Sequence, residues 1–195
     1  MRSLLVWAAA WGLSVQVAQA ADVVGAATSL RASAQQTPPQ QAATELALNA
    51  SIVRNAQLTT GASGLLHVTF LDDSKLAMGS NASIVVDQFT YGGQGSTGEQ
   101  ALRLGKGAFR FISGAIPKDK VRIETPSVTI GIRGTTLRTL VADDGTTTVG
   151  VDDGQAVVVS RQTGQIITLN PGEKVTIKPG GEVGTIMLGK VEGCP

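Results

Sequence analysis

The sequence has few of the side chains on which enzymes and metalloproteins rely. It contains one histidine, His67, and one cysteine, Cys194, and its two tryptophans, Trp7 and Trp11, both lie in the first twenty residues. A single cysteine excludes a disulfide within the chain. A single histidine excludes a metal site or a proton relay built from two imidazoles. Little therefore remains from which to build a catalytic or metal site.

The chain also lacks an excess of charge of either sign. Its 16 basic side chains face 15 acidic ones, and loss of Arg2 with an N-terminal leader would make the two numbers equal. Domains that hold nucleic acid or an anionic membrane surface carry a clear basic excess or stripe. The composition therefore predicts no nucleic-acid partner, although a local basic patch remains open.

No apolar run beyond residue 20 is long enough to cross a bilayer, which takes about 20 residues. Residues 1–20 have the pattern of a secretory signal peptide, with Arg2 before an apolar core from Leu4 to Val17 and a small-x-small site ending at Ala20. An uncleaved anchor is the alternative, but small and polar residues interrupt the apolar core. We expect cleavage before Ala21, which predicts a periplasmic or secreted bacterial protein without a transmembrane segment after removal of the signal peptide.

The remaining chain is long enough for one domain with its own core and too short for two of ordinary size. We expect a first strand and a loop rich in Gln and Pro over residues 21–44. The main domain is predicted over residues 45–185, and a C-terminal tail over residues 186–195.

Apolar and polar residues alternate along most of the chain, which is typical of half-buried β-strands. Leu66, Val68 and Phe70 are an early example, and Val175 and Ile177 are a late one. Turn signals separate such segments at Asp72-Asp73-Ser74, Gly79-Ser80-Asn81, Gly105-Lys106-Gly107, Asp143-Asp144-Gly145, Asp152-Asp153-Gly154, Asn170-Pro171-Gly172 and Pro179-Gly180-Gly181. The pattern predicts an all-β fold of many short strands and tight hairpins, arranged as a twisted sandwich or a β-solenoid-like stack, with little helix apart from the signal peptide.

The segment from Thr125 to Thr135 contains the clearest single strand. Its apolar residues share one face, and Gly131 and Gly134 indicate a bulge or a close approach of another backbone. The residues expected to form this strand and its turn are Ile130, Gly131, Ile132, Gly134 and Thr135. Arg133 would lie on the opposite face, either as a contact for a partner or as a brace for neighbouring turns.

The string Gly93-Gln94-Gly95-Ser96-Thr97-Gly98 matches the dinucleotide-binding pattern G-x-G-x-x-G. That function needs a helix directly afterwards, whereas Leu102 and Leu104 alternate as in a strand. We therefore interpret the string as a glycine-rich hairpin loop that belongs to no cofactor site. Candidate partner contacts in and beside this loop are Tyr91, Gly93 and Gly95.

Three pairs of adjacent aspartates raise the hypothesis of a calcium site. No D-x-D-x-D-G array occurs, and Asp-Gly is a favoured hairpin turn, so the pairs are interpreted as turn residues. His67 is expected on the surface, and no G-x-S-x-G elbow provides a nucleophile for it. The sequence thus predicts no catalytic, cofactor-binding or metal-binding residue, and hence no enzyme.

Five short stretches resemble, in their order along the chain, the FecR domain family. The resemblance runs from about Val23 to Val183. The stretches that carry it are Leu58–Gly64, Val68–Leu76, Leu104–Phe111, Thr125–Thr135 and Leu169–Val175.

The resemblance implies an extracytoplasmic all-β module of the bacterial envelope. FecR itself receives a signal from a TonB-dependent iron-siderophore receptor and passes it across the inner membrane to a sigma factor. We expect this chain to lack the membrane helix and the sigma-binding region, and to bind an unknown envelope protein in signalling related to iron uptake or as a scaffold. Binding of cell-wall or extracellular polysaccharide is the alternative, although the scarcity of aromatic side chains disfavours it. Homo-oligomers through Cys194 or through strand edges are a further expectation.

Overall fold

The structure is a computed structural model that describes residues 22–93 and 98–195. The predicted signal peptide, its cleavage site at Ala20 and Ala21, and Gly95 lie outside the described residues. The strands are β1 (Val23–Arg31), β2 (Ala34–Thr37), β3 (Thr44–Glu45), β4 (Ser51–Val53), β5 (Gln57–Thr60), β6 (Leu65–Phe70), β7 (Lys75–Met78), β8 (Ser83–Thr90), β9 (Glu99–Ile112), β10 (Val121–Glu124), β11 (Val128–Val141), β12 (Thr147–Ser160), β13 (Ile166–Leu169), β14 (Glu173–Ile177) and β15 (Met187–Leu188). A short 3-10 helix, η1 (Lys118–Lys120), lies between β9 and β10.

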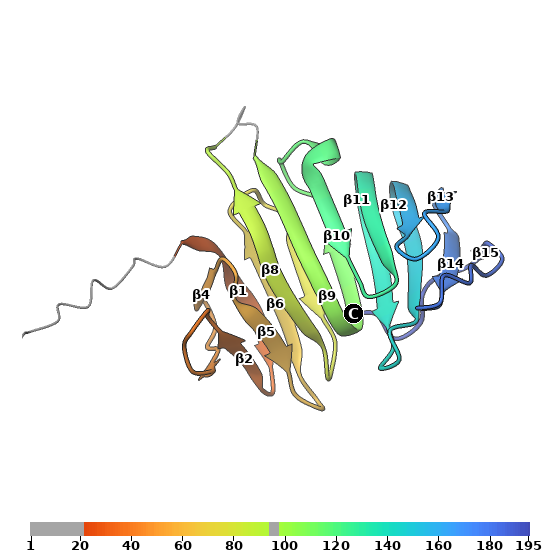
Figure 1. The fold of residues 1–195 in the computed structure, drawn as a ribbon. Coiled ribbons are helices and arrows are strands. Elements are labelled where there is room, and N and C mark those ends of the chain that lie inside the picture. The colour runs from red at the N-terminus through yellow and green to blue at the C-terminus, as the bar shows by residue number, and fades with distance from the viewer. Residues whose placement is uncertain (1–21, 94–97) are drawn as a thin grey trace, which may run out of the picture.

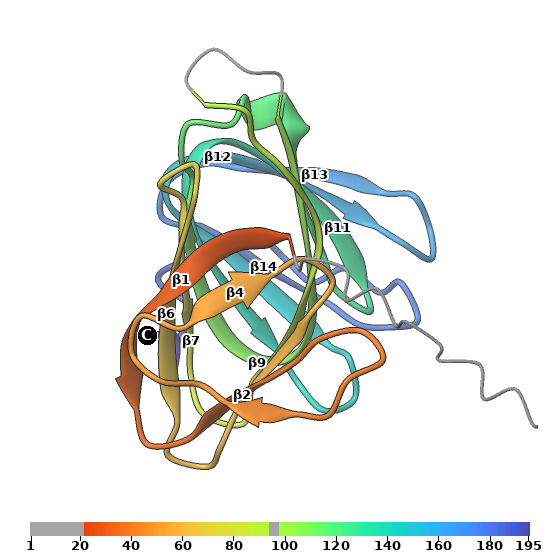
Figure 2. The ribbon, with the colours of Figure 1, turned by 90° about the vertical axis from the view of Figure 1, so that its left-hand side faces the viewer.

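All of these strands belong to one sheet, which confirms the predicted all-β fold. Neighbouring strands are antiparallel, apart from the parallel pair of β9 and β10. The strands follow one another along the stack from the N-terminal to the C-terminal end (Figure 1). Viewed along the stack, they wrap around a common core (Figure 2). The fold thus combines features of the two predicted arrangements, sandwich and solenoid-like stack.

The sheet forms two layers because three long strands pass from one layer into the other. The first half of β9 pairs with β8 and β10, whereas its second half pairs with β7 and β11. The strands β11 and β12 divide in the same way. We call the layer with β4, β1, β6, β7, β14 and β15 the first layer, and that with β3, β2, β5, β8, β10 and β13 the second. Each layer also contains one half of every long strand.

Each long strand bends at a glycine with positive φ: Gly107 at 105°, Gly134 at 65° and Gly154 at 78°. Two predicted tight turns, at Gly105-Lys106-Gly107 and at Asp152-Asp153-Gly154, are therefore wrong, because these residues lie inside β9 and β12. Glycine lets the backbone change direction while pairing continues on both sides. Of the two points where a bulge or a close approach was predicted, Gly134 is confirmed, because the register of β11 with β12 breaks between Arg133 and Thr136, whereas Gly131 stays in regular register with Val157.

One continuous core fills the space between the layers. Val68 and Leu76 enter it from the first layer, and Ile84 and Ile130 from the second. The rings of Phe70 and Phe89 stack across the core with their centroids 5.6 Å apart. Such stacking adds to the stabilisation from burial of the rings. The alternation of apolar residues read from the sequence therefore marks the inward face of the strands.

Candidate functional site

Loops and bends from distant parts of the chain meet along one edge of the stack. At the start of β9, a Cβ atom on Gly98 would lie 3.3 Å from the Ile116 side chain, which precedes η1. The side chain of Lys118 in η1 packs against Gly134, and Gly134 lies against Gly154. The β8–β9 loop, η1 and the bends of β11 and β12 thus follow one another along the same edge (Figures 1 and 2).

The predicted contact residues among residues 22–93 and 98–195 belong to this edge, although no hydrogen bond or ion pair joins them. Arg133 is exposed at the bend of β11, and within residues 22–93 and 98–195 its guanidinium forms no ion pair. Thr135 braces the bend instead, since its Oγ1 accepts a 3.1 Å hydrogen bond from the Arg133 backbone N–H and donates to the Gln155 carbonyl at 2.7 Å. The Arg133 side chain is therefore free to contact a partner.

The two described candidate contacts between β8 and β9, Tyr91 and Gly93, lie in different surroundings. Tyr91 is half-buried and packs against the core. Gly93 has a φ of 99°, and a Cβ atom there would meet no atom within 4 Å. The strand β9 begins at Glu99, directly after the G-x-G-x-x-G string, in the place where a dinucleotide site needs a helix. Tyr91 thus fixes the base of the loop, and Gly93 lies in open space.

Two of the three aspartate pairs, Asp72-Asp73 and Asp143-Asp144, occupy turns, whereas Asp152 and Asp153 lie within β12. The carboxylate of the buried Asp72 accepts hydrogen bonds from the Ser74 backbone at 3.1 Å and from the Ser74 hydroxyl at 2.6 Å. The exposed Asp144 accepts the equivalent pair from Thr146, and the backbone bond, followed by the hydroxyl bond, lowers the pKa of Asp144. The described part of the chain holds no group of three His, Cys, Asp or Glu residues placed to bind a metal.

The C-terminal end of the stack presents two edge strands with exposed apolar side chains. The ladder partner of β13 is β12, and that of β15 is β14, so in the described part of the chain each has one edge without a ladder partner. Ile166 in β13 is 69% exposed, and Met187 and Leu188 in β15 are 60% and 82% exposed. Open edges and apolar side chains together suit pairing with a strand of another protein.

The N-terminal end is covered to a greater extent. The segment that joins β3 to β4 returns over the edge of β1, where the backbone N–H of Asn49 donates to the Ala27 carbonyl at 2.8 Å. Leu46, at the start of this segment, is buried and belongs to the core. An ion pair between Arg54 and Asp22 closes the corner. The C-terminal end is therefore the better candidate for strand addition.

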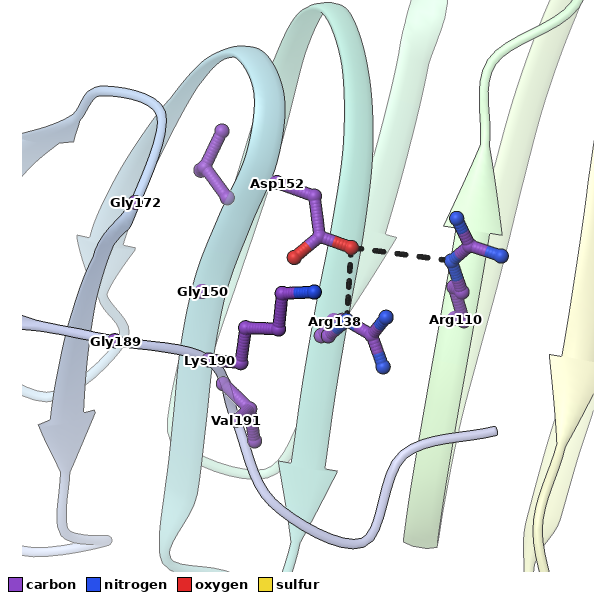
Figure 3. A pocket seen from close by; sticks show the side chains of 9 residues that line it. Arg110, Arg138, Gly150, Asp152, Gly172, Gly189, Lys190 and Val191 are labelled. Atoms are coloured by element: carbon purple, nitrogen blue, oxygen red, sulfur yellow. Dashed lines mark hydrogen bonds and ion pairs between the residues drawn. The ribbon is translucent and has the colours of Figure 1, made fainter.

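The C-terminal residues fold back over the outer face of the first layer, across β12 and β11 (Figure 3). Val191 is buried against Gly150. The thiol of Cys194 donates to the Thr139 carbonyl at 3.6 Å, and burial raises the pKa of this thiol. Pairing of Cys194 with a second chain would first have to break this contact.

The residues of the C-terminal edge and of the folded-back tail were not predicted as site residues. Two adjacent apolar residues in a strand place one of them on its outer face. Ile166 and Ile167 form such a pair, as do Met187 and Leu188, and these pairs are the signal in the sequence for this edge.

The described residues contain no helix with the length and hydrophobicity needed to cross a membrane.

Comparison with known proteins gives a family match and a structural match. The family model described as FecR protein matches residues 56–157. Two crystal structures of a candidate anti-sigma factor from Parabacteroides distasonis, at 2.50 and 1.65 Å resolution, match 69% of this chain with a TM-score of 0.54 and 14% identity. The match spans 60% of the length of those structures. No curated protein matches the chain.

Proposed function

The chain belongs to the FecR family, and from this premise we propose that it is a non-catalytic signalling module of the bacterial envelope that binds a partner protein. The family match and the fold shared with a candidate anti-sigma factor support a role in signalling. The signal-peptide pattern before Ala21 supports export. N-terminal sequencing of the protein from the periplasm or medium tests export directly, and we expect the chain to begin at Ala21.

The open C-terminal end of the stack is the observation that carries the proposed protein binding. Unpaired N–H and C=O groups on β13 and β15 can accept a partner strand, and Ile166 and Leu188 offer apolar area beside them. A strand added there would continue a layer, much as β14 continues the first layer beyond β12. The partner is therefore expected to supply an extended segment with apolar side chains.

The alternative of polysaccharide binding receives no support from the aromatic residues. The four phenylalanines, Phe70, Phe89, Phe109 and Phe111, are buried in the core, and Tyr91 packs against it. Sugar rings usually stack on exposed aromatic faces. Among the described residues, no exposed aromatic side chain offers such a platform.

A pull-down with matched variants tests the proposed function. The tagged chain is purified under native conditions from envelope fractions of its own host, beside the variants Leu188→Lys and Leu48→Lys. Leu48 is 60% exposed at the N-terminal end and serves as the control. We expect a protein that co-purifies with the wild type and with Leu48→Lys but not with Leu188→Lys. Recovery of every form as a lone monomer across growth conditions would argue against the proposal.

A further inference from the structure

A row of residues crosses the outer face of the first layer, one from each successive strand. Four of its six positions hold basic side chains and two hold small residues, which leaves hollows beside the long side chains. Register neighbours from β6 to β14 are His67, Ala77, Arg110, Arg138, Gly150 and Lys174. Because neighbouring strands lie about 4.8 Å apart, the row brings cations together that are far apart in the sequence.

Arg110 and Arg138 stand directly opposite each other in the β9–β11 pair. Like charges in this position repel. Asp152 is the carboxylate beside them, and its Oδ2 lies 2.8 Å from Arg138 Nε but 3.9 Å from Arg110 Nε (Figure 3). The shorter distance is a hydrogen bond, and the longer one is not. The Asp152 carboxylate therefore lies beside both guanidinium groups but accepts a hydrogen bond only from Arg138.

The Nε atom of Arg110 is buried and has no hydrogen-bond partner. Among residues 22–93 and 98–195, no other buried side-chain nitrogen or oxygen lacks a hydrogen-bond partner. A buried N–H without an acceptor is destabilising, and more so when it carries charge. An additional acceptor beside Arg110 would satisfy this group.

These side chains line a cavity of about 240 Å³ between the sheet and the folded-back tail. Lys190 extends into the same region from the tail, over β12 (Figure 3). Lys174 fixes the tail here, since its Nζ donates to the Lys190 carbonyl at 2.9 Å. Three cations and one carboxylate therefore line the cavity, which leaves an excess of positive charge in a recess.

On the outer face of the second layer, the two arginines that lie on adjacent strands, Arg103 on β9 and Arg122 on β10, have no such excess around them. Arg103, on the same strand as Arg110, lies 2.7 Å from Asp87 and 3.9 Å from Glu124. Arg122 lies 3.0 Å from Glu124. Arg103 and Arg122 thus each have a carboxylate within bonding distance, whereas Arg133, at the bend of β11, has none among the described residues. The charge imbalance around Arg110 and Arg138 is thus a local property of the cavity and does not extend to arginines on every strand.

We propose that this cavity binds an oxyanion, a phosphate or carboxylate group, between Arg110, Arg138 and Lys190. Guanidinium groups match the geometry of both anions with two parallel hydrogen bonds. A recess lined by one sign of charge also concentrates ligands of the opposite sign. The ligand would supply the acceptor that Arg110 Nε needs, and would offset the repulsion between the two arginines. The cavity adjoins β15, because Gly189 and Lys190 follow Leu188, but its two arginines lie on β9 and β11, so anion binding can be measured whether or not the C-terminal edge binds a partner.

Titration of the whole chain with sodium phosphate and with sodium succinate tests the proposal. Ionic strength is held constant with sodium chloride, and binding is followed by backbone NMR shifts. We expect saturable shifts for residues around Arg110 and Arg138 with one or both anions. Phosphate alone would identify a phosphate group as the ligand, and succinate alone a carboxylate. Shifts no larger than those with chloride for both anions would overturn the proposal.

Three variants show whether the named side chains hold the anion. Loss of a charge-assisted hydrogen bond weakens binding by at least about tenfold, so we expect such a loss in Arg110→Gln and in Lys190→Gln. Arg103→Gln, on the other layer, should bind as the wild type does. Lys190→Gln changes a side chain of the tail, so its result does not depend on folding of the sheet. Equal weakening in Arg103→Gln and Arg110→Gln would show a non-specific charge effect and contradict the proposed site.

Discussion

A Cβ atom added to Gly154 would lie 2.1 Å from the carbonyl oxygen of Gly134. These two glycines are the bends of β12 and β11, and each has a positive φ. The contact shows that adjacent long strands change layer at the same place, with their backbones too close for any side chain between them. The two layers therefore depend on glycine at these bends.

Gly154→Ala is expected to lower the free energy of unfolding by about 3 kcal/mol, because it adds both a backbone clash and an unfavourable φ. Gly164→Ala is the matched control. Gly164 has a φ of 71°, but a Cβ atom there meets nothing within 4 Å, so a loss of about 1 kcal/mol is expected. Urea denaturation measures both values. Equal losses would show that the close contact between the bends does not limit the fold.

Ile130→Asp places a charge in the core, where Ile130 is fully buried. A buried unpaired carboxylate is among the most destabilising single changes, and we expect a loss of at least about 4 kcal/mol. Ile166→Asp makes the same change at an exposed position of β13 and should cost about 0.5 kcal/mol or less. Thermal unfolding of the two variants checks the difference, and an unchanged melting transition for Ile130→Asp would contradict the burial of this residue.

Asp72→Ala removes a buried acceptor that serves the backbone N–H groups of Ser74 and Ile116 and the Ser74 hydroxyl. Of these donors, only the hydroxyl keeps an acceptor among the described residues, Gln100 Oε1 at 3.4 Å. The expected loss is about 3 kcal/mol. Asp144→Ala breaks the equivalent bonds to Thr146 in a fully exposed turn, where water replaces the lost acceptor. We therefore expect a clearly smaller loss for Asp144→Ala in chemical denaturation. A similar loss for both variants would mean that burial of Asp72 adds nothing.

The thiol of Cys194 is expected to react slowly with iodoacetamide near pH 8. Burial raises its pKa in the folded chain, so less thiolate is present than in the unfolded chain. Stability from this burial is present below the ordinary thiol pKa and is lost as the pH rises through the raised pKa. Val191→Asp, which should release the tail, is expected to increase the rate. A wild-type rate equal to that of the urea-unfolded chain would show that the tail is not packed.

The sequence pattern correctly predicted features that depend on residues close together in the sequence, such as the buried face of a strand or a hairpin turn. The alternation around Ile130 gave the correct face of β11, and the hairpin at Asp143-Asp144-Gly145 joins β11 to β12. The turn predicted at Asp152-Asp153-Gly154 was wrong because a glycine with positive φ suits both a hairpin and a bend within a strand. Which of the two occurs depends on the neighbouring bend at Gly134, and that contact is not local in sequence.

The cavity around Arg110 and Arg138 was not predictable for a related reason. Its residues come from β9, β11, β12 and the tail, and the pairing register between distant strands decides that Arg110 faces Arg138. A shift of one residue would turn these side chains into the core. Because the sequence contains nearly equal numbers of basic and acidic residues, its composition also gave no indication of the local excess of cations around Arg110 and Arg138.

Site-specific photo-cross-linking in the native host tests the central claim, partner binding at the C-terminal end, most directly. A photoreactive phenylalanine analogue is placed in turn at Ile166, Leu188 and the control position Leu48, and adducts are identified by mass spectrometry. We predict one discrete adduct with an envelope protein from both Ile166 and Leu188, and none from Leu48. Adducts from Leu48 alone, or none from Ile166 and Leu188 across growth conditions, would contradict the account.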